Sequence, residues 1–204
     1  MINQHRALII IFFLVFVFGC KTDKVPVKGE TAWQKKMNDQ FKDASTSPLT
    51  ETDLKSFKGL EFFKQDSLFV VKAELKRTPD SQWFDMKTTT ERLSKERIYG
   101  IATFELMGQV YQLNVYQGQE HLETVGMENH LFLPFLDLTN GDSTYGGGRY
   151  LDLKIPNGDI LIVDFNKAYN PYCVYNEKFS CPLVPRENFM AMEVKAGMKI
   201  YKSD

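Results

Sequence analysis

The sequence predicts an α+β domain, built mainly from an antiparallel β-sheet or a partly closed β-barrel, with helices on its N-terminal side. Three observations support this fold class. A helical pattern occupies residues 31–44, alternating strand patterns begin near residue 68, and glycine-containing turns separate several of the strands. Helices that come first and strands that follow are typical of an α+β arrangement.

The first segment, residues 1–19, has the composition of a signal peptide. A short basic start precedes an uncharged apolar run over residues 7–18, and a small residue, Gly19, stands before Cys20. The apolar run is shorter than the roughly 20 residues that a membrane-spanning helix needs. Val17-Phe18-Gly19-Cys20 resembles the lipobox of bacterial lipoproteins, in which the cysteine thiol is acylated, for example with palmitate, and becomes the first residue. The alternative is an incidental cysteine beside a cleaved peptide.

This interpretation predicts that the mature protein is held by lipid on Cys20 to a membrane of the bacterial cell envelope, outside the cytoplasm. Each acyl CH₂ buried in a bilayer contributes about 0.8 kcal/mol, so several chains on one cysteine anchor a protein firmly. Residues 20–30 are charged and lack a periodic apolar pattern, which favours a flexible tether. The remaining residues, 31–204, fit a single globular domain.

Composition limits the classes of partner. Hydrophobic residues make up 43% of the chain and aromatic residues 13%, which is enough for a substantial core. The 25 Lys and Arg residues nearly balance the 26 Asp and Glu residues. A near-neutral chain has no electrostatic footprint for nucleic acid, so we expect no nucleic-acid partner. No motif points to a cofactor.

The predicted N-terminal helix begins with a capping box, Thr31-Ala-Trp-Gln34. Its apolar residues share one face at helical spacing: Trp33, Met37, Phe41 and Ala44. We expect that face to pack on the domain. A second, shorter helix is predicted over residues 50–58.

Alternating apolar and polar residues predict the strands. Single strands are expected over residues 69–75 and 83–88, and a hairpin over residues 97–116 with its turn at Met107-Gly108. A second hairpin is expected over residues 151–163, because Asn157-Gly158 tolerates the positive φ values of a tight turn. Further extended segments are expected between residues 192 and 201.

A block over residues 131–197 is distinctive in composition and order. Its elements are Phe132–Asp137, Thr144–Tyr150, Asp164–Pro171, the cysteines Cys173 and Cys181, and Pro182–Asn188. This block closely resembles the signature of the family called domain of unknown function 1684, found in bacteria and archaea. The resemblance implies a shared fold, but it implies no activity.

The same block contains the candidate ligand-binding residues. These polar side chains are Tyr145, Arg149, Asp164, Asn166, Tyr169, Asn170, Glu187 and Asn188. Glycine at positions 146–148 allows close approach of a backbone, and the Arg149 guanidinium can hold a carboxylate or phosphate by paired hydrogen bonds. The functional interpretation is a site for a small polar or anionic ligand. The structural alternative is that Arg149 pairs with Asp164 across the second hairpin while the asparagines bond to loop backbone.

Three interpretations remain open for Cys173 and Cys181. An oxidising compartment favours a disulfide between them. A metal site would also need His121 and His130, which have no recognisable ligand spacing relative to the cysteines. A nucleophilic cysteine with one of these histidines as its base has no local signature.

Enzyme motifs are otherwise absent from the sequence. No serine stands in a Gly-x-Ser-x-Gly elbow, and the glycine run lacks the lysine of a phosphate-binding loop. Carboxylates that would have to converge for acid–base work are Asp137, Asp142, Asp152, Asp164 and Glu187. The sequence therefore favours an envelope binding module for a small polar ligand or a partner protein. The alternatives are a hydrolase-like enzyme that uses Arg149, Asp164, Glu187 or a cysteine, and a structural lipoprotein without a pocket.

Overall fold

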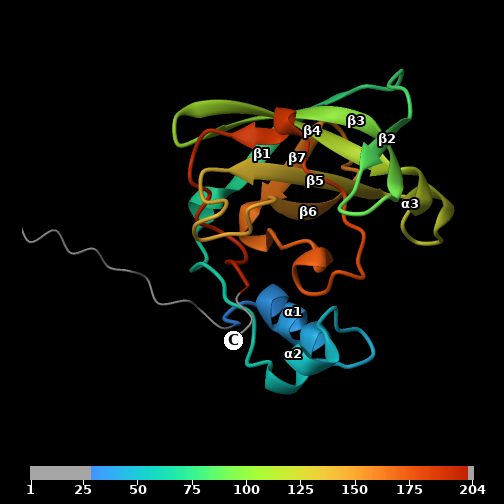
Figure 1. Ribbon diagram of the computed structural model, residues 1–204. Coiled ribbons are helices and arrows are strands. Elements are labelled where there is room, and N and C mark those ends of the chain that lie inside the picture. The colour runs from blue at the N-terminus through green and yellow to red at the C-terminus, as the bar shows by residue number, and fades with distance from the viewer. Residues whose placement is uncertain (1–28, 202–204) are drawn as a thin grey trace, which may run out of the picture.

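The computed structural model describes residues 29–201, which form a curled, half-barrel sheet of eight strands with a few short helices (Figure 1). The sheet is mostly antiparallel, and the longest helix lies at the N-terminal side. The predicted fold class is thus confirmed. The expected signal peptide, Cys20 and most of the tether lie outside the described residues. Within residues 29–201, no helix is long and apolar enough to cross a bilayer.

The strands follow one another along the sheet in the order β6-β5-β4-β3-β1-β7, while β2 pairs with β3, and β8 runs parallel to β5. Their bounds are Val70–Arg77 for β1, Phe84–Lys87 for β2, Leu93–Leu106 for β3, Gln109–Gly118 for β4, His130–Asp137 for β5, Arg149–Lys154 for β6, Ile160–Asp164 for β7 and Phe189–Met190 for β8.

The predicted first hairpin is confirmed as β3 and β4, and it is longer than the sequence pattern indicated. Met107 and Gly108 form its turn with φ values of 52° and 79°. Alternate residues of both strands enter the core because successive side chains of a strand point to opposite faces. This hairpin forms the middle of the sheet.

The predicted second hairpin is wrong. β6 pairs with β5, where Phe135 lies opposite Arg149, and β7 pairs with β1, where Val71 lies opposite Val163. The two strands therefore occupy opposite edges of the sheet. Gly158 does adopt a positive φ, of 96°, as the turn prediction required. The local turn signal was correct, but pairing with distant strands determined where each strand lies.

The helices are α1 (Ala32–Lys42), α2 (Glu51–Ser56) and α3 (Gln119–Glu123). The predicted capping box of α1 is confirmed, since Thr31 accepts from Gln34 N and the Gln34 side chain accepts from Thr31 N. α1 ends at Lys42, before the predicted Ala44, which is exposed. Asp43 takes the C-cap position, and the following turn replaces the expected last helical residues.

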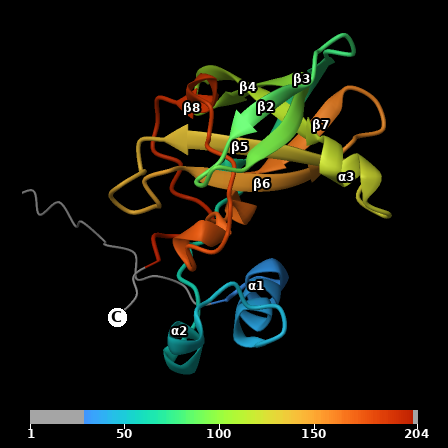
Figure 2. The same cartoon turned by 45° about the vertical axis from the view of Figure 1, so that its right-hand side comes forward.

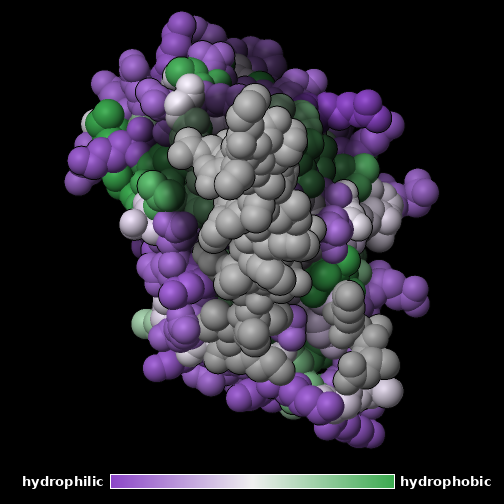
Figure 3. Space-filling model, turned by 90° about the vertical axis from the view of Figure 1, so that its left-hand side faces the viewer, coloured by the Kyte–Doolittle hydropathy of each residue, from purple (hydrophilic) through white to green (hydrophobic). Residues whose placement is uncertain are grey.

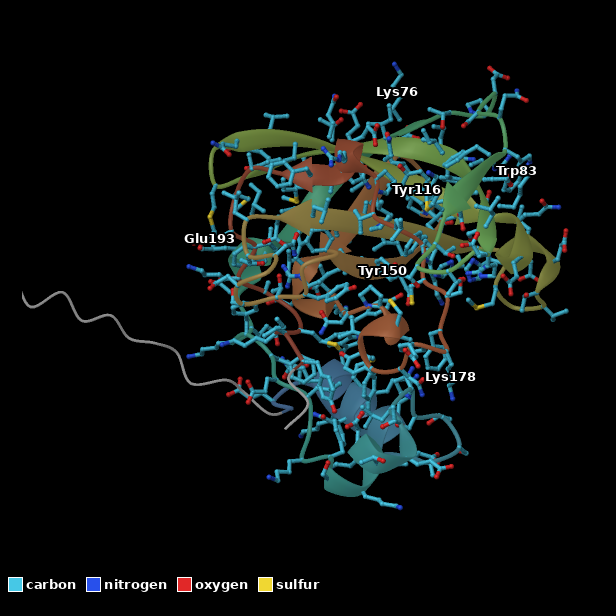
Figure 4. All side chains as sticks on the ribbon, in the orientation of Figure 1. Lys76, Trp83, Tyr116, Tyr150, Lys178 and Glu193 are labelled. Atoms are coloured by element: carbon cyan, nitrogen blue, oxygen red, sulfur yellow. The ribbon has the colours of Figure 1, made fainter. Side chains whose placement is uncertain are left out.

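Three apolar clusters stabilise the domain. The largest fills the space enclosed by the curled strands, and a second joins α1 and α2 to the C-terminal third of the chain through Phe41, Tyr175 and Met198. Figures 1 and 2 show this order of layers: the sheet, then the C-terminal segments in orange and red, then the two helices. The third cluster includes Tyr116 and Tyr150, which lie in the interior in Figure 4, whereas the labelled Lys76 and Lys178 lie at the surface.

Figure 3 shows both hydrophilic and hydrophobic side chains on one face of the molecule. Hydrophilic side chains predominate along the borders of that face, and hydrophobic residues form separate small groups.

Candidate functional site

Arg149, the central residue of the predicted ligand set, is fully buried. Its Nη2 atom lies 2.8 Å from Asp137 Oδ2 and donates to Val194 O at 2.8 Å, while Nη1 donates to Ala196 O and to Met198 O. The predicted alternative, an ion pair with Asp164, is wrong. β6 and β7 do not form the hairpin that would have placed these two residues opposite each other, and Asp164 instead pairs with Lys167 at 3.2 Å. Arg149 therefore secures the backbone of residues 194–198.

The glycine run before Arg149 has a steric role. Gly148 has a φ of 90°, and a Cβ there would lie 2.6 Å from Phe135 O and 2.7 Å from Val184 Cγ2. Any other residue would clash with the neighbouring strand in a backbone conformation that L side chains rarely adopt. Glycine at position 148 thus allows β6 to begin close enough to β5 for Arg149 to reach Asp137.

Three asparagines of the predicted set bond to backbone. Asn166 accepts from Asp66 N and donates to Asp66 O. Asn188 is buried, accepts from Asn114 N at 2.8 Å and donates to the carbonyls of Asn114 and Pro134. Asn170 donates to Lys199 O at 2.8 Å and to Tyr175 Oη at 3.2 Å. The hydrogen bonds of these amides connect chain segments that lie far apart in the sequence.

The remaining predicted residues do not converge with Arg149 on one ligand position. Glu187 is exposed. Tyr169 donates to Asp152 Oδ1 at 2.8 Å, and burial raises the pKa of its phenol well above the ordinary value. Tyr145 is half-buried, and its pKa is raised by burial and by the neighbouring Cys173 and Cys181. The structure thus distributes the predicted set over several separate contacts.

Cys173 and Cys181 lie next to each other as thiols. Cys173 N donates to Cys181 Sγ at 3.1 Å. A hydrogen bond from the Cys181 thiol lowers the pKa of Cys173 to about 7, and the same bond, with burial, raises the pKa of Cys181. Their adjacency is compatible with the predicted disulfide. Within residues 29–201, no group of three or more His, Cys, Asp and Glu side chains is arranged to hold a metal ion.

A cavity of about 540 Å³ lies between the helical layer and the C-terminal segment. Its walls come from four parts of the chain: α2 with Asp53 and Ser56, the following residues 57–61, the loop at Asp142 and Ser143, and residues 198–201, with Tyr175 at one side. The volume falls in the range of small-molecule sites, about 300–1,000 Å³. This is the candidate functional site.

Backbone hydrogen bonds join the walls of this cavity. Lys199 N donates to Glu61 O at 2.9 Å, and Ile200 N donates to Ser143 O at 2.9 Å. Arg149 donates to the carbonyls of Ala196 and Met198, and the Asn170 amide donates to that of Lys199. Two residues of the predicted ligand set therefore position the cavity wall without lining the cavity themselves.

The lining offers both signs of charge. Asp53, Glu61 and Asp142 supply carboxylates, and Lys58 and Lys199 supply ammonium groups. Ser56 and Ser143 add hydroxyl groups, and Phe57, Leu60 and Met198 add apolar surface. The Tyr175 hydroxyl is already bonded to Asn170 and Met198. The Tyr175 phenol stays neutral, because burial raises its pKa further above its ordinary value. Such a lining suits a small ligand with several polar groups.

The sequence did not identify this site because its residues come from four distant segments. Asn38 illustrates the point: this buried residue of α1 accepts from Leu60 N at 2.7 Å and so fixes the 57–61 wall. The only indication of this contact in the sequence was that Asn38, a polar residue, stands beside the apolar face of the predicted helix. Its partner, 22 residues away, has no sequence pattern of its own.

Comparisons with known proteins agree with this fold. The family model described as "Protein of unknown function (DUF1684)" matches residues 55–199. An uncharacterised protein of Haloarcula marismortui, solved by solution NMR, is 30% identical in sequence, and the match covers 81% of this chain and 89% of that one with a TM-score of 0.64. No curated protein matches the chain. Since the family model spans well over half of its residues, the chain belongs to the DUF1684 family.

Proposed function

We propose that this protein is a lipoprotein of the bacterial cell envelope whose domain binds a small polar ligand in the 540 Å³ cavity. The observation that carries the proposal is a cavity whose lining segment, residues 198–201, is held in place by hydrogen bonds from buried side chains. Arg149 and Asn170 are buried, polar and costly to keep in an apolar interior, and both use their hydrogen bonds to hold the segment that lines the cavity. These hydrogen bonds hold the lining segment in place and so support a cavity wall of fixed shape.

The ligand has groups that complement both signs of charge. Lys199 lies with its Nζ atom 4.9 Å from the Phe63 ring centroid, at the rim of the wall that Asn170 holds. Carboxylate or phosphate groups of a ligand would bind near this ammonium, and amino or hydroxyl groups near Asp53 and Asp142. A neutral or zwitterionic molecule with several polar groups fits better than a strongly charged one.

The anchor completes the proposed function. Cys20 follows an apolar segment in the sequence, and its acylation would hold the domain at a membrane surface outside the cytoplasm. Cys173 and Cys181 would then face an oxidising compartment, where exchange with an oxidised dithiol partner converts two thiols to a disulfide and reduces the partner.

The hydrolase-like alternative receives less support. Arg149 is buried against Asp137, Asp164 pairs with Lys167, and Glu187 is exposed, so these three groups have different neighbours. A catalytic constellation needs its acid, base and charge-stabilising groups around one reacting atom. The binding module therefore accounts for more of the geometry.

Amide NMR shifts of the chain during titration with inorganic phosphate, L-glutamate and glycerol test the proposal. We expect saturable shifts at Ser143 and Lys199 for the probe that fits, and we expect Ser143→Trp, which fills the cavity, to remove them. Ser45→Trp, in an exposed turn away from the cavity, is the matched control and should leave them intact. Absence of saturable shifts with all three probes, or shifts unchanged by Ser143→Trp, would contradict the proposal.

A further inference from the structure

Six buried side-chain polar atoms within residues 29–201 have no hydrogen-bond partner. Three of them come together at the α3 end of the sheet. They are Glu96 Oε2, His121 Nδ1 and His130 Nδ1. Buried polar groups are nearly always paired, because an unpaired one costs about 1–3 kcal/mol. Three of them in one cluster, well outside the lining of the cavity, indicate a second site.

The sheet register brings the three side chains together. Glu96 on β3 lies opposite Gly118 at the end of β4, and α3 starts directly afterwards, so His121 folds back over this position. A Cβ on Gly118 would lie 3.0 Å from His121 Nδ1 and 3.1 Å from Glu96 Oε1. The ring centroids of His121 and His130 are 4.1 Å apart. Glycine at position 118 thus lets the Glu96 carboxylate and the His121 ring pack directly against the backbone, which brings their unpaired atoms close to each other.

Asp152 determines the proton position on His130. Its Oδ1 atom lies 2.9 Å from His130 Nε2 and also accepts from the Tyr169 hydroxyl. An ionised carboxylate only accepts, so Nε2 carries a proton, and in a ring with a single proton Nδ1 presents a lone pair. The Asp152 side chain is 56% exposed while that of His130 is 12% exposed, so the cluster reaches the surface beside Asp152.

Each of the three unpartnered atoms can act as an acceptor. Glu96 Oε1 already accepts from Ser94 Oγ at 2.8 Å, which leaves Oε2 unpaired. Burial lowers the pKa of His121, so its ring is neutral and offers a second lone pair once the proton sits on Nε2. Glu120 and Asp152 add negative charge nearby, and Arg92 is the neighbouring cation that acts on Glu96. A ligand for this cluster must bring hydrogen-bond donors and preferably positive charge.

We propose that Glu96, His121 and His130 bind a protonated primary amine, with the ammonium group beside Gly118. The three N–H donors of an ammonium group match the three available acceptors, and its positive charge would stabilise the ionised form of Glu96, whose pKa is raised by burial. An anion finds no donor among these atoms. This site is independent of the proposed function, because none of its residues lines the 540 Å³ cavity.

The test uses the full-length chain in detergent and ¹⁵N shifts of the histidine rings. The chain has three histidines, two of them in the cluster, so assignment is direct. Methylammonium chloride should shift Nδ1 of His121 and His130 saturably. Tetramethylammonium chloride has the same charge and no N–H donor, so at equal ionic strength it should produce no saturable shift. Equal shifts with both salts, or none with methylammonium, would overturn the proposal.

Two variants test whether methylammonium binds at Glu96. Glu96→Gln should weaken methylammonium binding about tenfold or more, since a neutral amide replaces the charged acceptor. Glu105→Gln removes an exposed carboxylate from the same strand and should leave binding unchanged. If Glu96→Gln does not fold, as judged by its thermal melt, His121→Phe at the half-buried middle of α3 takes its place with the same expectation. Unweakened binding in the folded variant, or Zn²⁺ bound stoichiometrically in competition with methylammonium, would overturn the assignment.

Discussion

Arg149 and Asp137 form an ion pair in which neither side chain has exposed surface and the Nη2–Oδ2 distance is 2.8 Å. Asp137 also accepts from Thr139 N and from Val194 N, so the pair is the centre of a network that links β5, β6 and the C-terminal segment. Removing one partner leaves the other charge buried and uncompensated. This relationship gives the first prediction.

Arg149→Met should lower the free energy of unfolding by about 3–5 kcal/mol, because it leaves Asp137 unpaired and releases the carbonyls of residues 194–198. Urea unfolding monitored by circular dichroism measures the change. Lys167→Met removes the more exposed pair with Asp164 and should cost about 1 kcal/mol or less. Equal losses in the two variants would show that Arg149 has no special structural role.

Asn188→Ala should destabilise the domain by at least about 2 kcal/mol. The variant removes three hydrogen bonds and leaves a buried N–H and two carbonyls at the junction of β4 and β5. β4 and β5 share a single registered residue pair, Tyr116 with Phe132, so the side chain replaces missing strand pairing. Glu187→Ala, at the exposed neighbouring position, is the control. Melting temperatures that fall equally in both variants would refute this role.

The sequence predicted the elements whose partners are close in the sequence, and it failed where the partners are far apart in the sequence. The capping box of α1 and the β3–β4 hairpin involve neighbours in sequence, and both predictions were confirmed. The hairpin at Asn157-Gly158 was wrong because β7 pairs with β1, about 90 residues earlier in the chain. A turn signal specifies local backbone geometry and does not specify which strand lies alongside.

The same distinction applies to the site. The sequence identified Arg149 and Asn170 as important polar residues, yet their partners Ala196 and Lys199 contribute backbone carbonyls, which leave no residue-type pattern. The second site needed Glu96, His121 and His130 in contact, and only the sheet register places them together. The sequence therefore identified which polar residues are important, but it did not identify their neighbours in the folded structure.

The thiol pair gives a third prediction. In protein isolated from the envelope, Cys173 and Cys181 should be joined, because the thiols are adjacent and the lowered pKa of Cys173 favours the reactive thiolate near neutral pH. Mass analysis after alkylation without reduction should find neither cysteine modified. A disulfide of this kind typically contributes about 2–4 kcal/mol to stability. Two alkylated cysteines in freshly isolated protein would exclude the bridge.

The anchor gives a fourth prediction. Cys20→Ser should abolish incorporation of a labelled fatty acid, because the serine hydroxyl does not replace the acylated thiol, and the uncleaved precursor should accumulate. Cys173→Ser is the matched control, since it changes another cysteine to serine within the folded domain and should retain the label. Equal labelling of Cys20→Ser and wild-type protein would contradict the lipoprotein proposal.

The most direct test of the central claim is a crystal structure of the domain with the best-binding probe among phosphate, L-glutamate and glycerol. We expect the probe in the 540 Å³ cavity, with polar contacts to Ser143 and Lys199 and with Arg149 and Asn170 still bonded to the wall behind it. A probe bound elsewhere while the cavity is empty, or a cavity closed by the surrounding side chains, would contradict the account.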